Sequence, residues 1–195
     1  MKPQESDTER GPVDPAYPAL PGPIVRIETV NENLGDWRVD GADVSLSLRP
    51  VTTPLGLFSL RFDGTYVRRA RQDIFVGNTV DLIGALVPRW QQVLSMNLDQ
   101  GPWTGTVSHR YRRGYEDMNP LPDGSTRRVA SYQVWDAQLG YAFTRDVRLT
   151  LDVHNLLDKD PPFTNGGTSF QVGYNPGYAD PLGRTWTVAL TAAWR

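Results

Sequence analysis

From residue 37 onward the chain alternates apolar and polar residues over segments of roughly ten residues. In 37–49, for example, Val44, Leu46 and Leu48 interleave with Asp43 and Ser45. Alternation of this kind gives a β-strand one apolar and one polar face, and no segment sustains the period of an amphipathic helix. The sequence therefore predicts an all-β, antiparallel chain. The expected strands are 24–30, 37–49, 56–69, 89–99, 103–115, 132–143, 146–152 and 185–194.

The connections between these strands alternate in length. Short connections are expected at 50–55, 100–102 and 144–146, and long ones at 70–88, 116–130 and 156–184. Consecutive antiparallel strands place successive connections at opposite ends, so all the long loops fall at one end. Bacterial outer-membrane barrels have this asymmetry, with short periplasmic turns and long extracellular loops. The pattern predicts a transmembrane β-barrel segment of about eight strands whose C-terminus is periplasmic.

The direction in which the apolar face points separates a membrane barrel from a soluble β-sandwich. Strands of about ten residues suit a tilted crossing of a bilayer. Aromatic residues mark the strand ends on the apolar face, as in the pairs Trp103 and Tyr111, and Trp135 and Phe143, and aliphatic residues lie between them. Girdles of this kind are typical of membrane barrels. A sandwich would instead bury Leu94, Val107, Leu139 and Leu190 together in a dry centre.

Composition excludes several other classes. The net charge of -2 argues against a nucleic-acid partner, and the lack of cysteine excludes disulfides and thiolate sites. No apolar run approaches the roughly 18 residues of a membrane helix. Residues 1–23 lack the apolar core of a signal peptide, and we interpret them as a disordered, Pro-rich leader or the start of a fragment. Residues 24–195 form the predicted barrel part.

Few residues suggest chemistry. His154 stands near Asp152 and Asp158, which we interpret as a polar network at a strand end rather than a metal or acid–base site. His109 falls on the apolar face. Asp158-Lys159-Asp160 opens like a calcium loop, but Phe163 stands where glycine is needed. We expect no catalytic residue, metal or cofactor, and the chain is not predicted to be an enzyme.

Two further groups could contact a ligand. Five arginines, which could attract an anionic ferric chelate or a lipopolysaccharide phosphate, gather at the loop end of neighbouring strands: Arg110, Arg112, Arg113, Arg127 and Arg128. Solvated arginines near lipid headgroups are the simpler interpretation. The loop residues Tyr174 and Tyr178 could contact a ligand or pack within their loop. The ligand-binding residues therefore stay unknown.

Two motifs near the end of the chain suggest a family. The run VHNLLDKDPPF (residues 153–163), then YADPLGRTW (178–186) and a terminal strand, resembles the C-terminal end of TonB-dependent outer-membrane receptors. The resemblance implies uptake of a siderophore–iron complex or similar nutrient, driven by the TonB complex through a plug domain that this chain lacks. It also implies contact with outer-membrane lipid and lipopolysaccharide. Family members usually end in an aromatic residue, whereas this chain ends Trp194-Arg195.

Two alternatives to a receptor fragment remain at this point. Eight strands could close into a small barrel with a structural or adhesion role, which predicts that the strand at Ile24 pairs with the last strand. A soluble β-sandwich binding module is the other alternative. The sequence does not give the transported substrate, whether the chain functions alone, or the effect of Arg195 on barrel assembly.

Overall fold

The computed structural model describes residues 8–27, 35–75, 78–84, 86–117, 119–165 and 173–194. The chain divides into two compact units, Met1–Trp37 with Gln72–Val80, and Arg38–Arg71 with Asp81–Arg195. Every regular element in the described residues is a β-strand. The described part of the chain contains no helix long and apolar enough to cross a membrane. The all-β prediction is confirmed.

The second unit is built on one sheet with the strand order β12-β11-β10-β7-β6-β4-β3. Its members are β3 (Trp37–Thr53), β4 (Gly56–Phe75), β6 (Trp90–Gln100), β7 (Trp103–Arg112), β10 (Tyr132–Ala142), β11 (Val147–His154) and β12 (Thr185–Ala192). Neighbouring strands follow one another along the chain, and the pairs from β4 to β12 are antiparallel. The sheet is an up-and-down meander.

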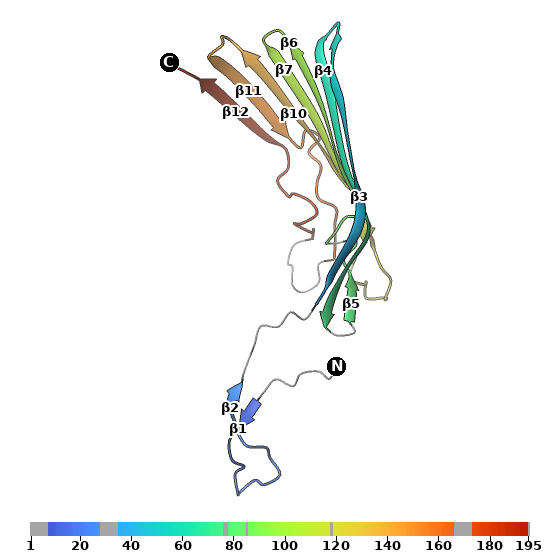
Figure 1. The fold of residues 1–195 in the computed structure, drawn as a ribbon, viewed down its shortest axis with the longest axis vertical. Helices are drawn as coiled ribbons and strands as arrows, with labels where there is room; N and C mark the ends of the chain where they lie inside the picture. Colours follow the sequence, from blue (N-terminus) through green and yellow to red (C-terminus); the bar gives the residue numbers. More distant parts are fainter. Residues whose placement is uncertain are drawn as a thin grey trace. The chain divides into compact units, whose positions relative to one another are not determined.

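Short turns lie at one end of this meander and long connections at the other, as predicted (Figure 1). The turn between β6 and β7 contains only Gly101 and Pro102. Gly101 has φ 56°, a conformation that glycine adopts without steric cost. One long connection carries the small hairpin β8 (Tyr115–Glu116) and β9 (Arg128–Val129). The ends of the strands therefore differ in character, and only the loop end can hold an elaborate site.

The sheet has the predicted eight strands among the described residues, but one member differs from the prediction. The eighth strand is β5 (Asn78–Asp81), a short element that pairs with β4. The expected strand 24–30 is described only as β2 (Ile24–Ile27), and residues 28–34 lie outside the described residues. β2 pairs with β1 (Thr8–Arg10). The small closed barrel required β2 to pair with the last strand instead, so the described residues do not support that alternative.

β1 also lies inside the segment interpreted as a disordered leader. Its alternation was too short to be seen, because three residues carry no measurable period. Short antiparallel pairing and the hydrogen bond from Gly11 N to Pro23 O at 2.8 Å hold β1 against β2. In the described part of the second unit, β12 and β3 end the strand order, so the sheet is open.

One face of the sheet is apolar across all its strands. The register aligns Leu98, Gly105, Leu139, Leu151 and Val188 in one row. The side chains of this row do not meet a second layer: Leu139 is 48% exposed and Val188 is 68% exposed, as is Leu190 in a neighbouring row. The dry centre that a sandwich requires is absent from the described residues, and the sandwich alternative is wrong.

Aromatic residues border this apolar face at both strand ends. Near the turns, the rings of Trp103 and Tyr141 lie 4.5 Å apart, centroid to centroid, and Tyr141 lies 4.9 Å from Phe143. Near the loops, the His109 and Trp135 rings lie 4.4 Å apart. The aliphatic rows lie between, so the predicted pair of aromatic girdles is confirmed, and His109 is on the apolar face as expected.

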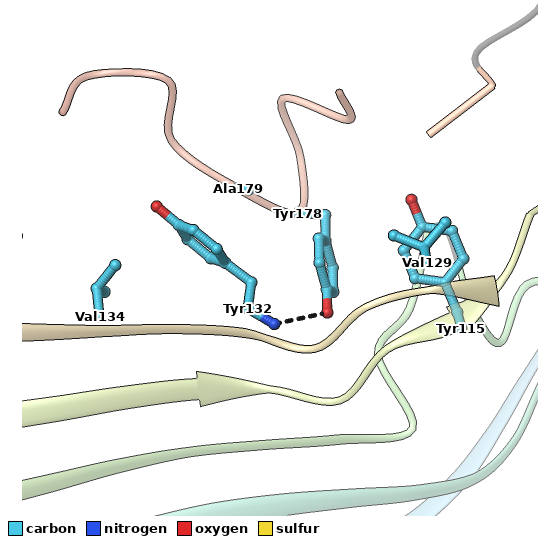
Figure 2. Close-up of a cluster of buried hydrophobic side chains, with 6 residues drawn as sticks. All are labelled: Tyr115, Val129, Tyr132, Val134, Tyr178 and Ala179. Carbon is cyan, nitrogen blue, oxygen red and sulfur yellow. Dashed lines mark hydrogen bonds between the residues drawn. The ribbon is translucent and has the colours of Figure 1, made fainter. Parts of the chain in front are cut away.

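One cluster of buried side chains in the second unit lies at the loop end, where loops fold onto the strands. It consists of Tyr115, Val129, Tyr132, Val134, Tyr178 and Ala179. Figure 2 shows the Tyr178 ring reaching from its loop to the strand that carries Tyr132. An apolar core at one end fixes the loops in place, while the sheet itself stays one layer thick.

Candidate functional site

The polar face of the sheet carries side chains that hydrogen-bond in pairs between neighbouring strands. In one row Thr106 Oγ1 donates to Asn97 Oδ1 at 2.8 Å, and Gln138 Nε2 donates to Asp152 Oδ1 at 2.5 Å. The register places these four residues side by side on β6, β7, β10 and β11. A face of amides, hydroxyls and carboxylates that bond mostly to one another is suited to water or to a polar filling rather than to lipid.

Arg110, Asp136 and His154 form an ion-pair network across three strands of this face. Arg110 Nη2 lies 3.0 Å from Asp136 Oδ2, and His154 Nδ1 lies 2.8 Å from Asp136 Oδ1. Arg110 Nη2 is also 3.1 Å from His154 Nε2. A neutral imidazole would donate from Nδ1 to Asp136 and accept from Arg110 at Nε2. Each group thus satisfies its neighbours, and the network fixes the ends of three adjacent strands.

The loop before β12 folds over this network through Tyr178. The Tyr178 hydroxyl accepts from Tyr132 N at 3.1 Å and lies within donating distance of the Arg112 and Ala130 carbonyl oxygens, at 3.0 and 3.1 Å. Arg112 Nη1 donates to the carbonyls of Gly177 and Tyr178 at 2.9 and 2.6 Å. Tyr178 is 2% exposed, and its burial raises its pKa to about 12.

A pocket of about 330 Å³ lies between this loop and the strands. Its wall contains Arg110, Arg112 and His154 from the strands and Pro176–Pro181 from the loop. The charges that line it are already partnered, since Arg110 binds Asp136 and Arg112 binds loop carbonyls. The pocket can offer hydrogen bonds to a polar ligand. Its lining presents no nucleophile placed beside a base and no pair of groups arranged as general acid and general base.

The two motifs found in the sequence form one structure at the end of β11. Asn155, with φ 52°, accepts from Lys159 N at 2.8 Å and donates to Lys159 O at 3.0 Å. Asp158 Oδ1 accepts from Arg184 N at 2.7 Å, which ties this turn to the start of β12. The side chain of Asn155 folds back onto the nearby backbone of Lys159. Asp158 binds a residue 26 positions away, which no local pattern predicts.

The residues grouped with His154 in the sequence do not form a cluster with it. Asp152 bonds to Gln138, Asp158 bonds to Arg184, and the carboxylate beside His154 is Asp136. Sequence reasoning missed Asp136 because the contact crosses between strands, although the register of β10 with β11 would have revealed it. No group of three acidic or histidine residues placed to hold a metal occurs in the described residues.

The five arginines of the predicted basic cluster divide into two sets. Arg110 and Arg112 are engaged on the polar face, and the Arg127 guanidinium lies 4.5 Å from the centroid of the Phe163 ring. Arg113 and Arg128 are exposed and line another pocket together with Arg89. Of the two loop tyrosines, Tyr178 is a packing residue, and Tyr174 is half-buried.

A second loop-to-loop contact was not expected from the sequence. The buried Asp117 accepts from Thr164 Oγ1 at 3.0 Å and from Asn165 N at 2.5 Å. Tyr115 OH donates to Thr164 Oγ1 at 3.3 Å. Asp117 thereby joins the loop between β7 and β10 to the loop after β11. Loop residues of this kind have no periodic signal, so nothing in the sequence pattern identified this contact.

The sequence model of a family described as "TonB dependent receptor-like, beta-barrel" matches residues 4–156. The chain belongs to this family. The match covers most of the sheet. It is largely independent of the two motifs at 153–163 and 178–186, because it ends at residue 156. A search of curated proteins gives no match.

Solved structures of import receptors and of a transporter share the fold. The chain is similar to the closed form of the ferric-catecholate import receptor Fiu from E. coli K12, with 21% identity and a TM-score of 0.54 over 81% of this chain and 21% of that one. It is similar to the siderophore receptor PirA from Acinetobacter baumannii, with 17% identity and a TM-score of 0.57 over 80% and 22%. It is also similar to the copper transporter OprC, with 19% identity and a TM-score of 0.52 over 80% of this chain and 23% of that one.

The chain therefore spans less than a quarter of the length of these receptor chains. At such identity the likeness establishes the fold and not the cargo. The open sheet agrees with this coverage, because a barrel of about 22 strands has room for many more strands beside β3 and β12.

Proposed function

We propose that this chain forms part of the barrel wall of an outer-membrane receptor that takes part in TonB-dependent uptake of a siderophore–iron complex or a similar large nutrient. The observation that supports it most is the family match over residues 4–156. Residues 24–195 supply barrel wall, and residues 1–23 precede it as a leader. The plug domain and the TonB-contacting segment come from sequence outside this chain, and the chain acts as a fragment of the receptor.

In this proposal the two faces of the sheet have separate roles. The apolar face with its aromatic girdles contacts outer-membrane lipid, where exposed residues such as Val188 (68% exposed) lose contact with water. The polar face lines the lumen, and its partnered charges give a hydrated wall for the plug or the passing nutrient. The role is positioning and passage rather than catalysis.

The long connections are extracellular in this proposal, and the short turns are periplasmic. Tyr178 and Asp117 hold two of the long connections against the strands. A loop end that is partly fixed in advance loses less conformational entropy when a ligand binds. A siderophore-type chelate is the proposed cargo because two of the three similar structures described above are siderophore or ferric-catecholate receptors, and copper is the alternative because the third is a copper transporter.

Uptake of labelled metal tests this proposal in the bacterium that makes the protein. An in-frame deletion of the codons for 37–194 should remove uptake of iron supplied as a ferric catecholate, while uptake of copper stays unchanged. Disabling TonB in the undeleted strain should give the same loss. Unchanged iron uptake in the deletion strain would refute the siderophore role, and a selective loss of copper uptake would transfer the proposal to copper.

A further inference from the structure

A second pocket at the loop end, apart from the one beneath Tyr178, collects three arginines. Its volume is about 370 Å³, and it is lined by Arg89, Arg113 and Arg128 together with Glu116 and four further residues, Ile83, Gly84, Gly114 and Tyr115. Three positive charges against one carboxylate give this small space a net charge of +2 from the charges of its lining residues. A concentration of guanidinium groups in one hollow attracts anions.

These arginines are available for a ligand, unlike the arginines on the polar face. Among the described residues, none of the three forms an ion pair, and only Arg89 has a side-chain hydrogen bond, from Nη1 to Arg68 O at 3.4 Å. Glu116 accepts from Thr126 Oγ1 at 3.5 Å and not from an arginine. In contrast, Arg110 is held by Asp136 and Arg112 by the loop.

The backbone around the pocket is fixed, so the arginines are held near one another by the fold. Arg113 N donates to Trp90 O at 2.9 Å, and Arg89 O accepts from Val67 N at 3.0 Å. β9 carries Arg128 opposite Glu116. A Cβ at Gly114 would lie 2.3 Å from Val129 O. The glycine that follows Arg113 therefore allows β9 to pack closely against the backbone at this point.

We propose that Arg89, Arg113 and Arg128 form a binding site for a phosphate group. Guanidinium groups present paired N–H donors that match the oxygens of a phosphate, and several of them around one oxyanion bind it by bidentate hydrogen bonds. The same chemistry serves free inorganic phosphate and the phosphate of a lipid headgroup. The site does not depend on the identity of the transported nutrient.

Binding to the full chain folded in non-ionic detergent tests the site. One arm titrates inorganic phosphate, and the other titrates lipid A with and without its phosphates. Arg113→Gln and Arg128→Gln should each weaken binding roughly tenfold, since a hydrogen bond to a charged group accounts for about that factor. Arg127→Gln is the matched control, because it removes the same charge from the adjacent position but lies outside the pocket lining.

The two arms separate the sources of the phosphate. Binding of inorganic phosphate that the pocket variants lose supports a site for the free ion, and loss restricted to phosphorylated lipid A supports a headgroup site. No binding in either arm, or an equal loss in Arg127→Gln, overturns the proposal. A normal heat-dependent gel shift of each variant shows that it folds. Failure here would leave iron uptake intact, so it is distinguishable from failure of the transport proposal.

Discussion

At the scale of single residues, Tyr178 is the residue that holds the loop before β12 against the strands. Its hydroxyl group contacts the backbone of Arg112, Ala130 and Tyr132, and its ring centroid lies 5.1 Å from that of the Tyr115 ring. Burial makes the loss of the phenol proton costly, because the phenolate would leave water for an apolar surrounding. The sequence left open whether this residue contacts a ligand or packs within its loop, and the structure shows it packed in the core.

Raising the pH should release this loop. Burial raises the pKa of Tyr178 from 10.0 to about 12, so between these values the unfolded chain loses a proton that the folded chain keeps. The stabilisation present below pH 10 is therefore lost as the pH rises toward 12. Urea unfolding in detergent should show a loss of roughly 2 kcal/mol across this range.

Two variants isolate the contribution of this residue. Tyr178→Phe should reduce stability at neutral pH by about 1–3 kcal/mol, because it leaves Tyr132 N without its partner, and it should remove part of the alkaline loss. Tyr174→Phe is the control on the same loop, since no hydrogen bond of its hydroxyl is present in the described residues. Equal alkaline profiles for the wild type and Tyr178→Phe would show that Tyr178 does not cause the loss.

At the scale of elements, the turn at the end of β11 is where the chain leaves the sheet and enters the loop before β12. Asn155 is 1% exposed, takes a left-handed conformation and bonds twice to Lys159. Asn155 N also donates to Asp136 Oδ1 at 2.9 Å, which joins the turn to the Arg110 network. The turn therefore connects the strand end, the polar face and, through Asp158, the start of β12.

Replacing Asn155 should disrupt this turn. Asn155→Ala loses two hydrogen bonds and places alanine in the left-handed region, at a combined cost of about 2–3 kcal/mol in the free energy of unfolding. Asn155→Gly keeps the conformation and should cost less. Leu157→Ala, at a 69% exposed position of the same turn, should stay within about 0.5 kcal/mol. Urea unfolding measures all three, and equal losses would contradict the assigned role.

Strands could be predicted from the sequence where apolar and polar residues alternate over enough positions to mark a strand with two unlike faces. The seven strands from β3 to β12 that form the sheet order, and the alternation of short and long connections, follow from the pattern. The extension of β3 through Pro50 to Thr53 does not, since 50–55 was expected as a connection. The extension of β4 to Phe75 did not, because Arg68, Arg69 and Arg71 hide the period. β1 and β5 are too short to show one. Contacts such as Asp117 with Asn165 join distant loops, and nothing local specifies them.

At the scale of the whole molecule, the chain presents a sheet with two unlike faces and one end that carries all the long loops, in a protein assigned to its family by the match over residues 4–156. The apolar face was predictable because residue parity fixes it along every strand. The pairing partner of Ile24–Ile27 was not predictable, because a short strand can pair with any free edge of a sheet. What the apolar face contacts is the question on which the proposed outer-membrane location depends.

Site-directed labelling tests this question directly, and the cysteine-free sequence makes it clean. Single cysteines replace Val107, Leu139 and Val188 on the apolar face, and Thr106, Gln138 and Thr187 on the polar face. Each variant is labelled with an environment-sensitive fluorophore in liposomes. The first three positions should be quenched by brominated lipid and the other three by aqueous iodide. Quenching by lipid at both sets, or by iodide at both sets, would contradict the assignment of the apolar face to lipid.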